Sequence, residues 1–201
     1  METNASSGSN KSFKIKIDHV TRLEGHGSIR IDVDAGRVEN VKLEIVEANR
    51  FFENLVRDLP AHDVPQTVSR ICGICCVGHQ LAAIKAVENA LNIGISEQTR
   101  LLRKLLNESQ FLQSHALHLF FLAVPDYVGV KSILPLAGSQ PELIKKALKL
   151  KKLANDFTRI LGGRTLHPMM PTLGGWRKLP DTNELELLLQ RLQDSISDVE
   201  Q

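Results

Sequence analysis

The sequence lacks long hydrophobic runs and any strong surplus of charge. No apolar run among its 201 residues approaches the roughly 18 that a membrane-spanning helix needs. Lys and Arg total 25 against 23 Asp and Glu, and the net charge of +2 is too small to indicate a nucleic-acid or membrane-surface partner. A content of 42% hydrophobic and 24% charged residues is typical of a globular protein, so a disordered chain is not expected.

Cysteine is also scarce, with three residues that all lie between Cys72 and Cys76. A disulfide framework spreads its cysteines along the chain, so this clustering favours reduced thiols, a cytoplasmic location and a local thiol site. The first ten residues are polar, with no basic start and no apolar stretch. They predict a disordered lead over residues 1–12 rather than a secretory signal.

Residues 13–47 alternate apolar with charged side chains, as in Lys14-Ile15-Lys16-Ile17. This period of two predicts a small antiparallel sheet with one wet face, and Asp34-Ala35-Gly36 is expected to form a turn within it. Residues 48–201 change to helical periodicity. The expected fold class is therefore α+β, a small N-terminal antiparallel sheet followed by a mainly helical bundle.

The helical region carries start and stop signals. A short helix is expected over 51–59, ended by Pro60, and Ser96 is the expected N-cap of a long helix that ends before Pro125. Two further helices are expected from Pro141 to Gly162-Gly163 and from Asp181–Asn183 onward, with a Gly/Pro-rich loop over 162–180 between them. The apolar stripe of the last helix still runs at Gln201, so the chain is expected to be a fragment or one piece of a larger assembly.

The most informative segment reads Arg-Ile-Cys-Gly-Ile-Cys-Cys-Val-Gly-His, from Arg70 to His79. The thiolates of Cys72 and Cys75 are three residues apart and can both turn toward one point, and Gly73 is expected to permit a tight backbone between them. Soft thiolates select zinc, iron, nickel or copper(I). His79 would ligate the metal or hydrogen-bond a thiolate, and Arg70 would stabilise negative charge.

Other interpretations of this segment compete with a transition-metal site. A thioredoxin-like redox pair would follow a strand in a βαβ unit, whereas these cysteines lie in a helical stretch. A c-type haem needs histidine directly after the second cysteine, where Cys76 stands. A structural zinc site needs four ligands, and the chain has no second cysteine pair. Cys76 itself is expected to be a small buried hydrophobe.

The pattern Arg-x-Cys-Gly-x-Cys-x-x-x-His, at residues 70–79, resembles the N-terminal metal-binding signature of the large subunit of nickel–iron hydrogenases. Arg22-Leu23-Glu24-Gly25-His26 is similar to a second segment of that family. Arg50-Phe51-Phe52-Glu53 is similar to a third, in which the glutamate lies near a second metal. A fourth match resembles a loop of cytoplasmic multisubunit members and comprises Gly162-Gly163-Arg164, His167-Pro168 and Gly174-Gly175.

The resemblance implies roles for single residues. Cys72 would be a terminal nickel ligand, and Cys75 would bridge nickel and an iron whose coordination is completed by carbon monoxide and cyanide. His79 would hydrogen-bond near the bridging thiolate. Glu24 would take a proton from the site after cleavage of H2, and Glu53 would help to bind a magnesium or similar ion.

The resemblance is incomplete, because the family's second motif, Asp-Pro-Cys-x-x-Cys-x-x-His, is absent and no cysteine follows Cys76. It therefore implies an N-terminal fragment of a hydrogenase large subunit, inactive alone. The implied partners are the missing C-terminal half, a small subunit with iron–sulfur clusters and further electron-carrier subunits, without nucleic acid or a membrane span. His167 is expected to order its own loop.

The expected organisation is a lead over 1–12, a sheet region over 13–47 and a helical region over 48–201 that carries the metal motif, an incomplete large-subunit fold. Two other functions stay open at this point. One is a non-catalytic hydrogenase-like scaffold or electron-transfer complex subunit. The other is a small zinc-binding interaction module.

Overall fold

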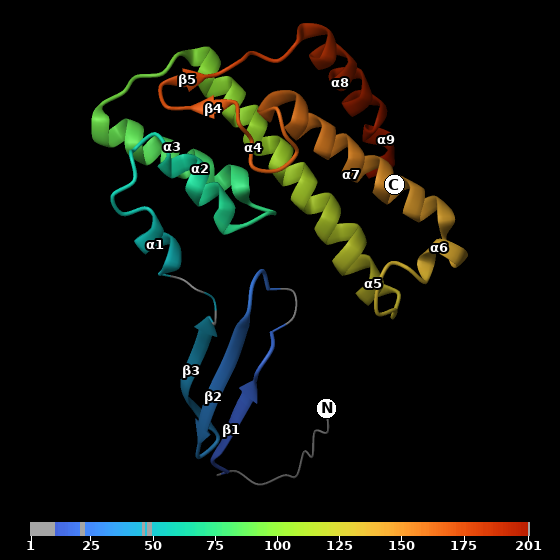
Figure 1. Ribbon diagram of the computed structural model, residues 1–201. Helices are drawn as coiled ribbons and strands as arrows, with labels where there is room; N and C mark the ends of the chain where they lie inside the picture. Colours follow the sequence, from blue (N-terminus) through green and yellow to red (C-terminus); the bar gives the residue numbers. More distant parts are fainter. Residues whose placement is uncertain (1–10, 21–22, 46, 48–49, 201) are drawn as a thin grey trace. The chain divides into compact units, whose positions relative to one another are not determined.

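The computed structural model describes residues 11–20, 23–45, 47 and 50–200. They belong to two compact units, Met1–Asn54 and Leu55–Gln201 (Figure 1). The first contains a three-stranded antiparallel sheet and the second is mainly helical. This confirms the α+β class that the sequence predicts.

The sheet has the order β1-β2-β3, with antiparallel neighbours. Its strands are β1 (Phe13–Ile17), β2 (Gly27–Asp34) and β3 (Arg37–Ile45). Only Ala35 and Gly36 separate β2 from β3, and both have positive φ angles, 47° and 76°. A two-residue hairpin with left-handed residues at both positions matches the right-handed twist of the strands, which is why the expected turn forms here.

The two faces of the sheet differ in chemical character. Ile15 pairs with Ile31, which in turn pairs with Val41, so apolar side chains share one face. On the opposite face the Nε atom of Arg30 lies 2.9 Å from a carboxylate oxygen of Glu44. The other residues that line this charged face are Lys14, Lys16, Asp32, Asn40 and Lys42. The wet face predicted from the alternating sequence is confirmed.

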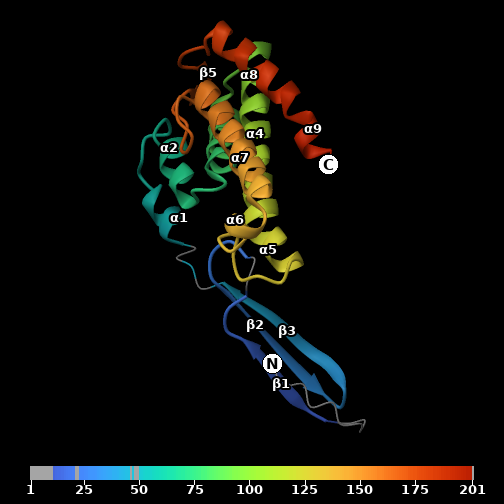
Figure 2. The same ribbon diagram turned by 90° about the vertical axis from the view of Figure 1, so that its right-hand side faces the viewer.

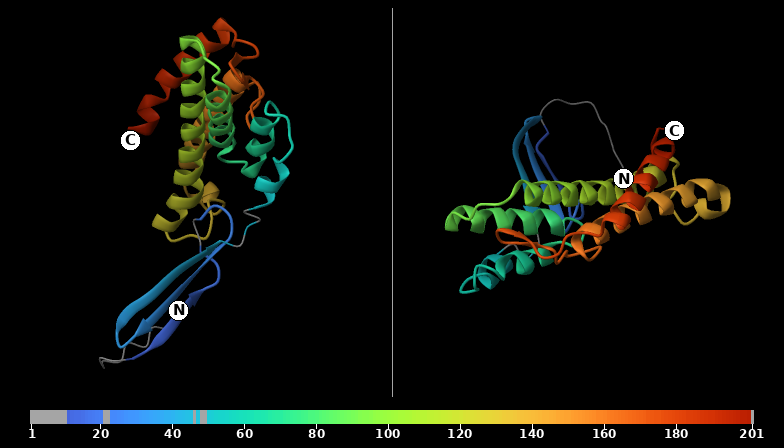
Figure 3. Two further views of the ribbon diagram at one scale, coloured as in Figure 1. Left: turned by 90° about the vertical axis from the view of Figure 1, so that its left-hand side faces the viewer. Right: turned by 90° about the horizontal axis from the view of Figure 1, so that it is seen from above.

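The second unit is built around two long helices, α4 (Glu97–Leu117) and α7 (Pro141–Gly162), which run side by side in opposite directions (Figures 1 and 2). A short hairpin of β4 (Pro171–Thr172) and β5 (Gly175–Trp176) follows α7. Helix α8 (Thr182–Asp194) then packs against α7 (Figure 3). The remaining helices are α1 (Phe51–Leu55), α2 (Val64–Val68), α3 (Cys76–Leu91), α5 (Val124–Tyr127), α6 (Leu136–Ser139) and α9 (Ile196–Val199).

The core of the helical unit lies where α3, α4, α7 and α8 meet. Leu106 of α4 and Leu161 of α7 are fully buried there, and each such side chain contributes about 1.5–3 kcal/mol by leaving water. The core also contains Cys76, Val77, Leu102, Leu153, Phe157 and Leu188. Ser109 and Thr158 share a buried hydrogen bond of 3.0 Å between their hydroxyl groups, which joins α4 to α7 without leaving either group unpaired.

Two helix signals in the sequence act as expected. The hydroxyl of Ser96 accepts a hydrogen bond from the amide of Thr99 at 3.2 Å and caps α4. Gly163 ends α7 with a φ of +77°, and a Cβ atom at this position would lie 2.8 Å from the Met170 side chain. Only glycine meets both requirements, since the conformation is left-handed and the space is taken.

Two expected boundaries are wrong. The helix expected over 51–59 ends at Leu55, after which the chain turns through Asp58 with a φ of +63°. The long helix continues past Pro125 to Tyr127 through a π-helical stretch, His118–Ala123. Proline has no amide hydrogen for the ordinary bond to the carbonyl four residues earlier, and the wider π turn accommodates that loss.

The C-terminal part differs from expectation in two places. The segment 162–180 contains the hairpin β4–β5, whose turn includes Gly174 with a φ of +70°. The last helix is interrupted at Ser195, whose hydroxyl donates to the Leu192 carbonyl at 2.8 Å. Hydroxyl bonds of this kind compete with the helix ladder and are not visible in an apolar stripe. Among the described residues no helix is both long and apolar enough for a membrane crossing.

The N-cap of α8 gives a first testable prediction. The carboxylate of Asp181 accepts hydrogen bonds from the amides of Asn183 at 2.9 Å and Glu184 at 3.2 Å. Asp181→Ala is expected to lower the free energy of unfolding by about 1 kcal/mol, measured by urea denaturation. Asp181→Asn retains a capping oxygen and serves as the control; an equal loss in both variants would contradict the capping role.

Candidate metal centre

The two cysteines of the motif lie on a bend between two helical segments. A 3-10 turn, Ser69–Ile71, ends in extended backbone at Cys72, and α3 begins directly after Cys75. The amide of Cys75 donates a hydrogen bond to the sulfur of Cys72 at 3.2 Å, so this sulfur turns back toward the residue that carries the second thiol. Cys72 is 8% exposed and Cys75 is half-buried, and neither forms a disulfide.

The N-terminus of α3 is capped from another helix. The side-chain oxygen of Gln110, on α4, accepts hydrogen bonds from the amides of Val77 at 2.8 Å and Gly78 at 3.3 Å. The side chain of Cys75, at the N-cap position, makes no capping bond. Gln110 therefore takes over a task that the N-cap side chain often performs, and its helix fixes the direction in which α3 leaves the bend.

This cap carries a second prediction. Gln110→Met would leave two helix amides without an acceptor, one of them on the buried Val77, and is expected to cost about 2 kcal/mol of stability in urea denaturation. Gln98→Met makes the same change at an exposed position of α4. We expect its effect to stay within about 0.5 kcal/mol. Equal losses in the two variants would show that the cap contributes nothing.

Gly73 does not have the role that the sequence suggests. Its φ is not in the left-handed region, and a Cβ atom built on it meets no neighbouring atom within 4 Å. The expectation that the bend needs glycine for its backbone is therefore wrong. The bend closes instead through the amide-to-sulfur bond between Cys75 and Cys72, which any residue at position 73 permits.

The segment that follows α7 crosses the cysteine bend. The Nδ1 atom of His167 lies 2.9 Å from the carbonyl oxygen of Ser69, and the His167 amide donates to the sulfur of Cys76 at 3.2 Å. Cys76 is 2% exposed and belongs to the core, as the sequence predicts. His167 thus contacts residues on both sides of the bend.

The neighbouring proline carbonyl adds two further contacts. Gln66 of α2 and Gln80 of α3 each donate a side-chain hydrogen bond to the carbonyl oxygen of Pro168, at 3.0 and 2.8 Å. Gly162 permits this approach, because a Cβ atom there would lie 2.5 Å from the Pro168 side chain. The Gly-Gly and His-Pro pairs of the sequence are therefore needed for one packed crossing.

A buried ion pair holds the end of the same segment. Arg103 of α4 makes two hydrogen bonds to the carboxylate of Glu88, of 2.6 and 2.8 Å, and also donates to the Thr172 carbonyl at 2.9 Å. Glu88 accepts a further bond from the amide of Gly174 at 2.8 Å. Burial by itself raises the pKa of Glu88, but the bonds from Arg103 and Gly174 outweigh it and hold that pKa below its usual range.

The other candidate residues of the helical unit lie close to the cysteines in sequence. Arg70 is exposed in the 3-10 turn that precedes Cys72. His79 is half-buried in the first turn of α3, and its amide donates to the Cys75 carbonyl at 3.2 Å. Over the described ranges no group of three or more His, Cys, Asp or Glu side chains is placed to hold a metal ion.

Two candidates belong to the sheet unit. Glu24 is exposed on a bend, where Gly25 has a φ of +83° and the amide and ring of His26 both reach one oxygen of Glu47 at 3.0 Å. Glu53 is exposed and lies 3.4 Å from the Nε atom of Arg50. Arg22, which precedes Glu24 in the motif, lies outside the described residues.

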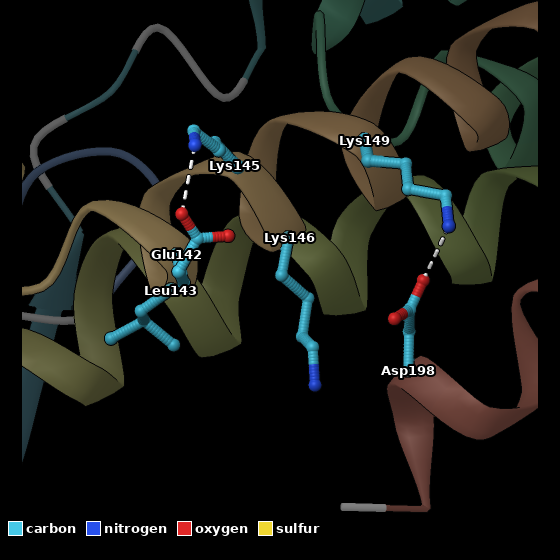
Figure 4. Close-up of a pocket in the computed structure, with 6 residues that line it drawn as sticks. All are labelled: Glu142, Leu143, Lys145, Lys146, Lys149 and Asp198. Carbon is cyan, nitrogen blue, oxygen red and sulfur yellow. Dashed lines mark hydrogen bonds and ion pairs between the residues drawn. The ribbon is translucent and has the colours of Figure 1, made fainter.

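A hollow on the outer face of α7 has a different character (Figure 4). Lys145 lies 2.7 Å from Glu142, and Lys149 lies 2.7 Å from Asp198 of α9. The other residues that line it are Leu143 and Lys146. Paired lysines and acids of this kind are typical of a solvated helix face rather than of an anion site.

Comparison with known proteins defines the class. Residues 50–146 match the nickel-dependent hydrogenase family, and residues 14–48 match a HoxL-like family. The chain belongs to the nickel-dependent hydrogenase family and corresponds to the N-terminal part of its large subunit.

Two curated relatives and two solved structures illustrate the match. The alpha subunit of sulfhydrogenase 2 from Pyrococcus furiosus is 36% identical over 182 residues, covering 90% of this chain and 44% of that protein. The vhu-type F420-non-reducing hydrogenase of Methanocaldococcus jannaschii has a subunit that is 38% identical over 185 residues, covering 88% and 44%. A NAD+-reducing NiFe hydrogenase in the H2-reduced state superposes with a TM-score of 0.81 at 31% identity, covering 96% of this chain and 44% of that one.

The Ni-Fe-Se hydrogenase of Desulfovibrio vulgaris Hildenborough in the reduced state superposes with a TM-score of 0.75 at 27% identity, covering 95% and 43%. The chain therefore spans less than half the length of the relatives that it matches.

Proposed function

We propose that Cys72 and Cys75 supply two thiolate ligands to a nickel–iron centre in a hydrogenase that interconverts H2 with two protons and two electrons. The observation that carries this proposal is the bend itself. Its amide-to-sulfur hydrogen bond of 3.2 Å turns the Cys72 sulfur toward Cys75, at the end of α3 where the helix dipole favours negative charge.

The donor set fits a soft transition-metal pair. Thiolates donate electron density to nickel and iron more readily than to hard cations. The described residues offer no third donor beside the two cysteines, so the proposal takes the remaining thiolates from outside this chain, and carbon monoxide and cyanide on the iron. When bound, the centre would supply the reversible cleavage of H2. We assign Cys72 as a terminal nickel ligand and Cys75 as the bridging one.

The other candidates would act around these sulfurs. His79, one helical turn after Cys75, would donate a hydrogen bond to the bridging thiolate. Arg70 would offset the negative charge of the thiolate set. The carboxylate of Glu24 would receive the proton that a terminal thiolate releases. Glu53 would exchange its ion pair with Arg50 for a magnesium or similar ion.

The proposal extends to partners. An electron pathway requires a small subunit with iron–sulfur clusters and further electron-carrier subunits, and we propose that the 201-residue chain alone does not turn over H2. Three cysteines in no disulfide fit a reducing compartment, which supports a cytoplasmic location.

Metal binding tests the proposal directly. We expect the purified chain, titrated anaerobically with Ni²⁺, to bind one metal ion and to gain thiolate-to-nickel charge-transfer absorption. A parallel titration with Zn²⁺ separates the alternatives. Stoichiometric zinc with no nickel uptake, even when a relative's C-terminal half is supplied, would favour the zinc-binding module and overturn the hydrogenase assignment. Neither metal binding at all would favour a non-catalytic scaffold.

A further inference from the structure

The contact between His167 and Ser69 joins two segments that are far apart in sequence. Ser69 is fully buried and lies three residues before Cys72, in the turn that leads into the bend. Its carbonyl oxygen can only accept a hydrogen bond, so the Nδ1 atom of His167, 2.9 Å away, carries the proton. The ring therefore holds the turn from which the first thiol is presented.

The electrostatic surroundings support this neutral tautomer. Burial holds the pKa of His167 below its usual value, and the positive charges of Arg70 and Arg164 lower it further, while the bond to the Ser69 carbonyl opposes them. At neutral pH the ring is therefore uncharged, with the Nδ1 proton committed to Ser69.

The backbone at His167 is also specialised. Its φ of +51° lies in the left-handed region, which histidine, asparagine and aspartate enter more readily than most other residues. This conformation lets its amide reach the Cys76 sulfur while its ring reaches Ser69. One residue thereby grips the chain on both sides of the four-residue bend.

We propose that His167 is a positioning residue for the thiol pair: by holding the Ser69 carbonyl it fixes the turn before Cys72, and thereby the placement of the Cys72 sulfur relative to Cys75. This inference rests on the proposed metal-binding function. Residues that orient metal ligands from the next layer typically change metal affinity by about 10–100-fold when they are lost. An effect of that size is expected here without a loss of fold.

Two substitutions separate the hydrogen bond from the backbone. His167→Gly keeps the left-handed conformation but removes the donor. His167→Asn also tolerates that conformation and places an amide N–H near the position of Nδ1. Leu166→Gly is the matched control, because it adds the same flexibility at the neighbouring, exposed position without removing a bond.

The readout is the affinity of the chain for Ni²⁺, taken from the thiolate-to-nickel absorption at a temperature where circular dichroism shows every variant folded. We expect His167→Gly to bind about 10-fold more weakly or worse, and His167→Asn and Leu166→Gly to stay within about 3-fold of the unaltered chain. Equal affinity of His167→Gly and the unaltered chain would overturn the positioning role alone, as would a His167→Asn variant as weak as His167→Gly. An unaltered chain that binds no nickel would overturn the proposed function and this inference with it.

Discussion

Serine at Cys72 or Cys75 is expected to remove nickel binding from the chain. Each substitution deletes one of two soft donors, so the loss of affinity should exceed the roughly 10–100-fold typical of residues that only orient a ligand. Serine is close to cysteine in size, and the sulfur of Cys72 is engaged by an amide that a serine oxygen can also receive. The fold should therefore survive, and the thiolate-to-nickel absorption should disappear.

The third cysteine provides the control for this experiment. Cys76 lies in the core, and its sulfur accepts the His167 amide, a bond that a serine oxygen can also accept. Cys76→Ser is expected to lower the melting temperature, because it places a hydroxyl in an apolar cluster, and to leave nickel affinity within a few-fold of the unaltered chain. A loss of binding in Cys76→Ser equal to that in Cys75→Ser would mean that the metal is held by a different pair of thiols.

The local elements of the fold can be predicted from the sequence, because their causes are local. Alternation over residues 13–17 and the Ala35-Gly36 pair predict the strands and their hairpin. Ser96 and Gly163 mark the ends of long helices through bonds and conformations confined to a few residues. The π-helical stretch before Pro125 is missed, because the proline signals a break but not whether the helix widens or stops.

The same distinction applies to the candidate site. The cysteine motif predicts a bend, and a bend is found, since all its residues lie within four positions of one another. The supports come from elsewhere: Gln110 is 33 residues from Val77, and His167 is 98 residues from Ser69. A glutamine on an otherwise apolar helix stripe signals a buried partner, but the sequence does not say which one. The role assigned to Gly73 failed because spacing says nothing about φ.

The buried pair of Glu88 and Arg103 carries the largest expected effect on stability. Their side chains are only 6% and 7% exposed, and the pair also holds the backbone of Thr172 and Gly174. Arg103→Met would leave a carboxylate buried without its counter-charge, and is expected to lower the free energy of unfolding by about 3–5 kcal/mol. Against a typical total of about 5–15 kcal/mol, such a loss is readily measured by urea denaturation.

An exposed pair and a double variant complete that measurement. Lys145→Met breaks a pair with Glu142 in which both side chains are more than 70% exposed, and its effect should stay below about 1 kcal/mol. The double variant Glu88→Met/Arg103→Met removes both charges at once, so it should be less destabilised than the sum of the two single variants, by about 0.5–3 kcal/mol. Additive losses would show that the two side chains act independently.

The same pair predicts a pH dependence with a definite sign. The pKa of Glu88 is lower in the folded chain than its unfolded value of about 4.3. A carboxylate of this kind stabilises the fold fully above its unfolded pKa, and that contribution is lost as pH falls through the folded pKa. The stability difference between the unaltered chain and Glu88→Gln should therefore be constant from about pH 7 to 5 and shrink below about pH 4. Since glutamine does not titrate and arginine stays charged throughout, a difference that instead grows on acidification would show that Glu88 is protonated in the native chain and that Arg103 does not stabilise its charge.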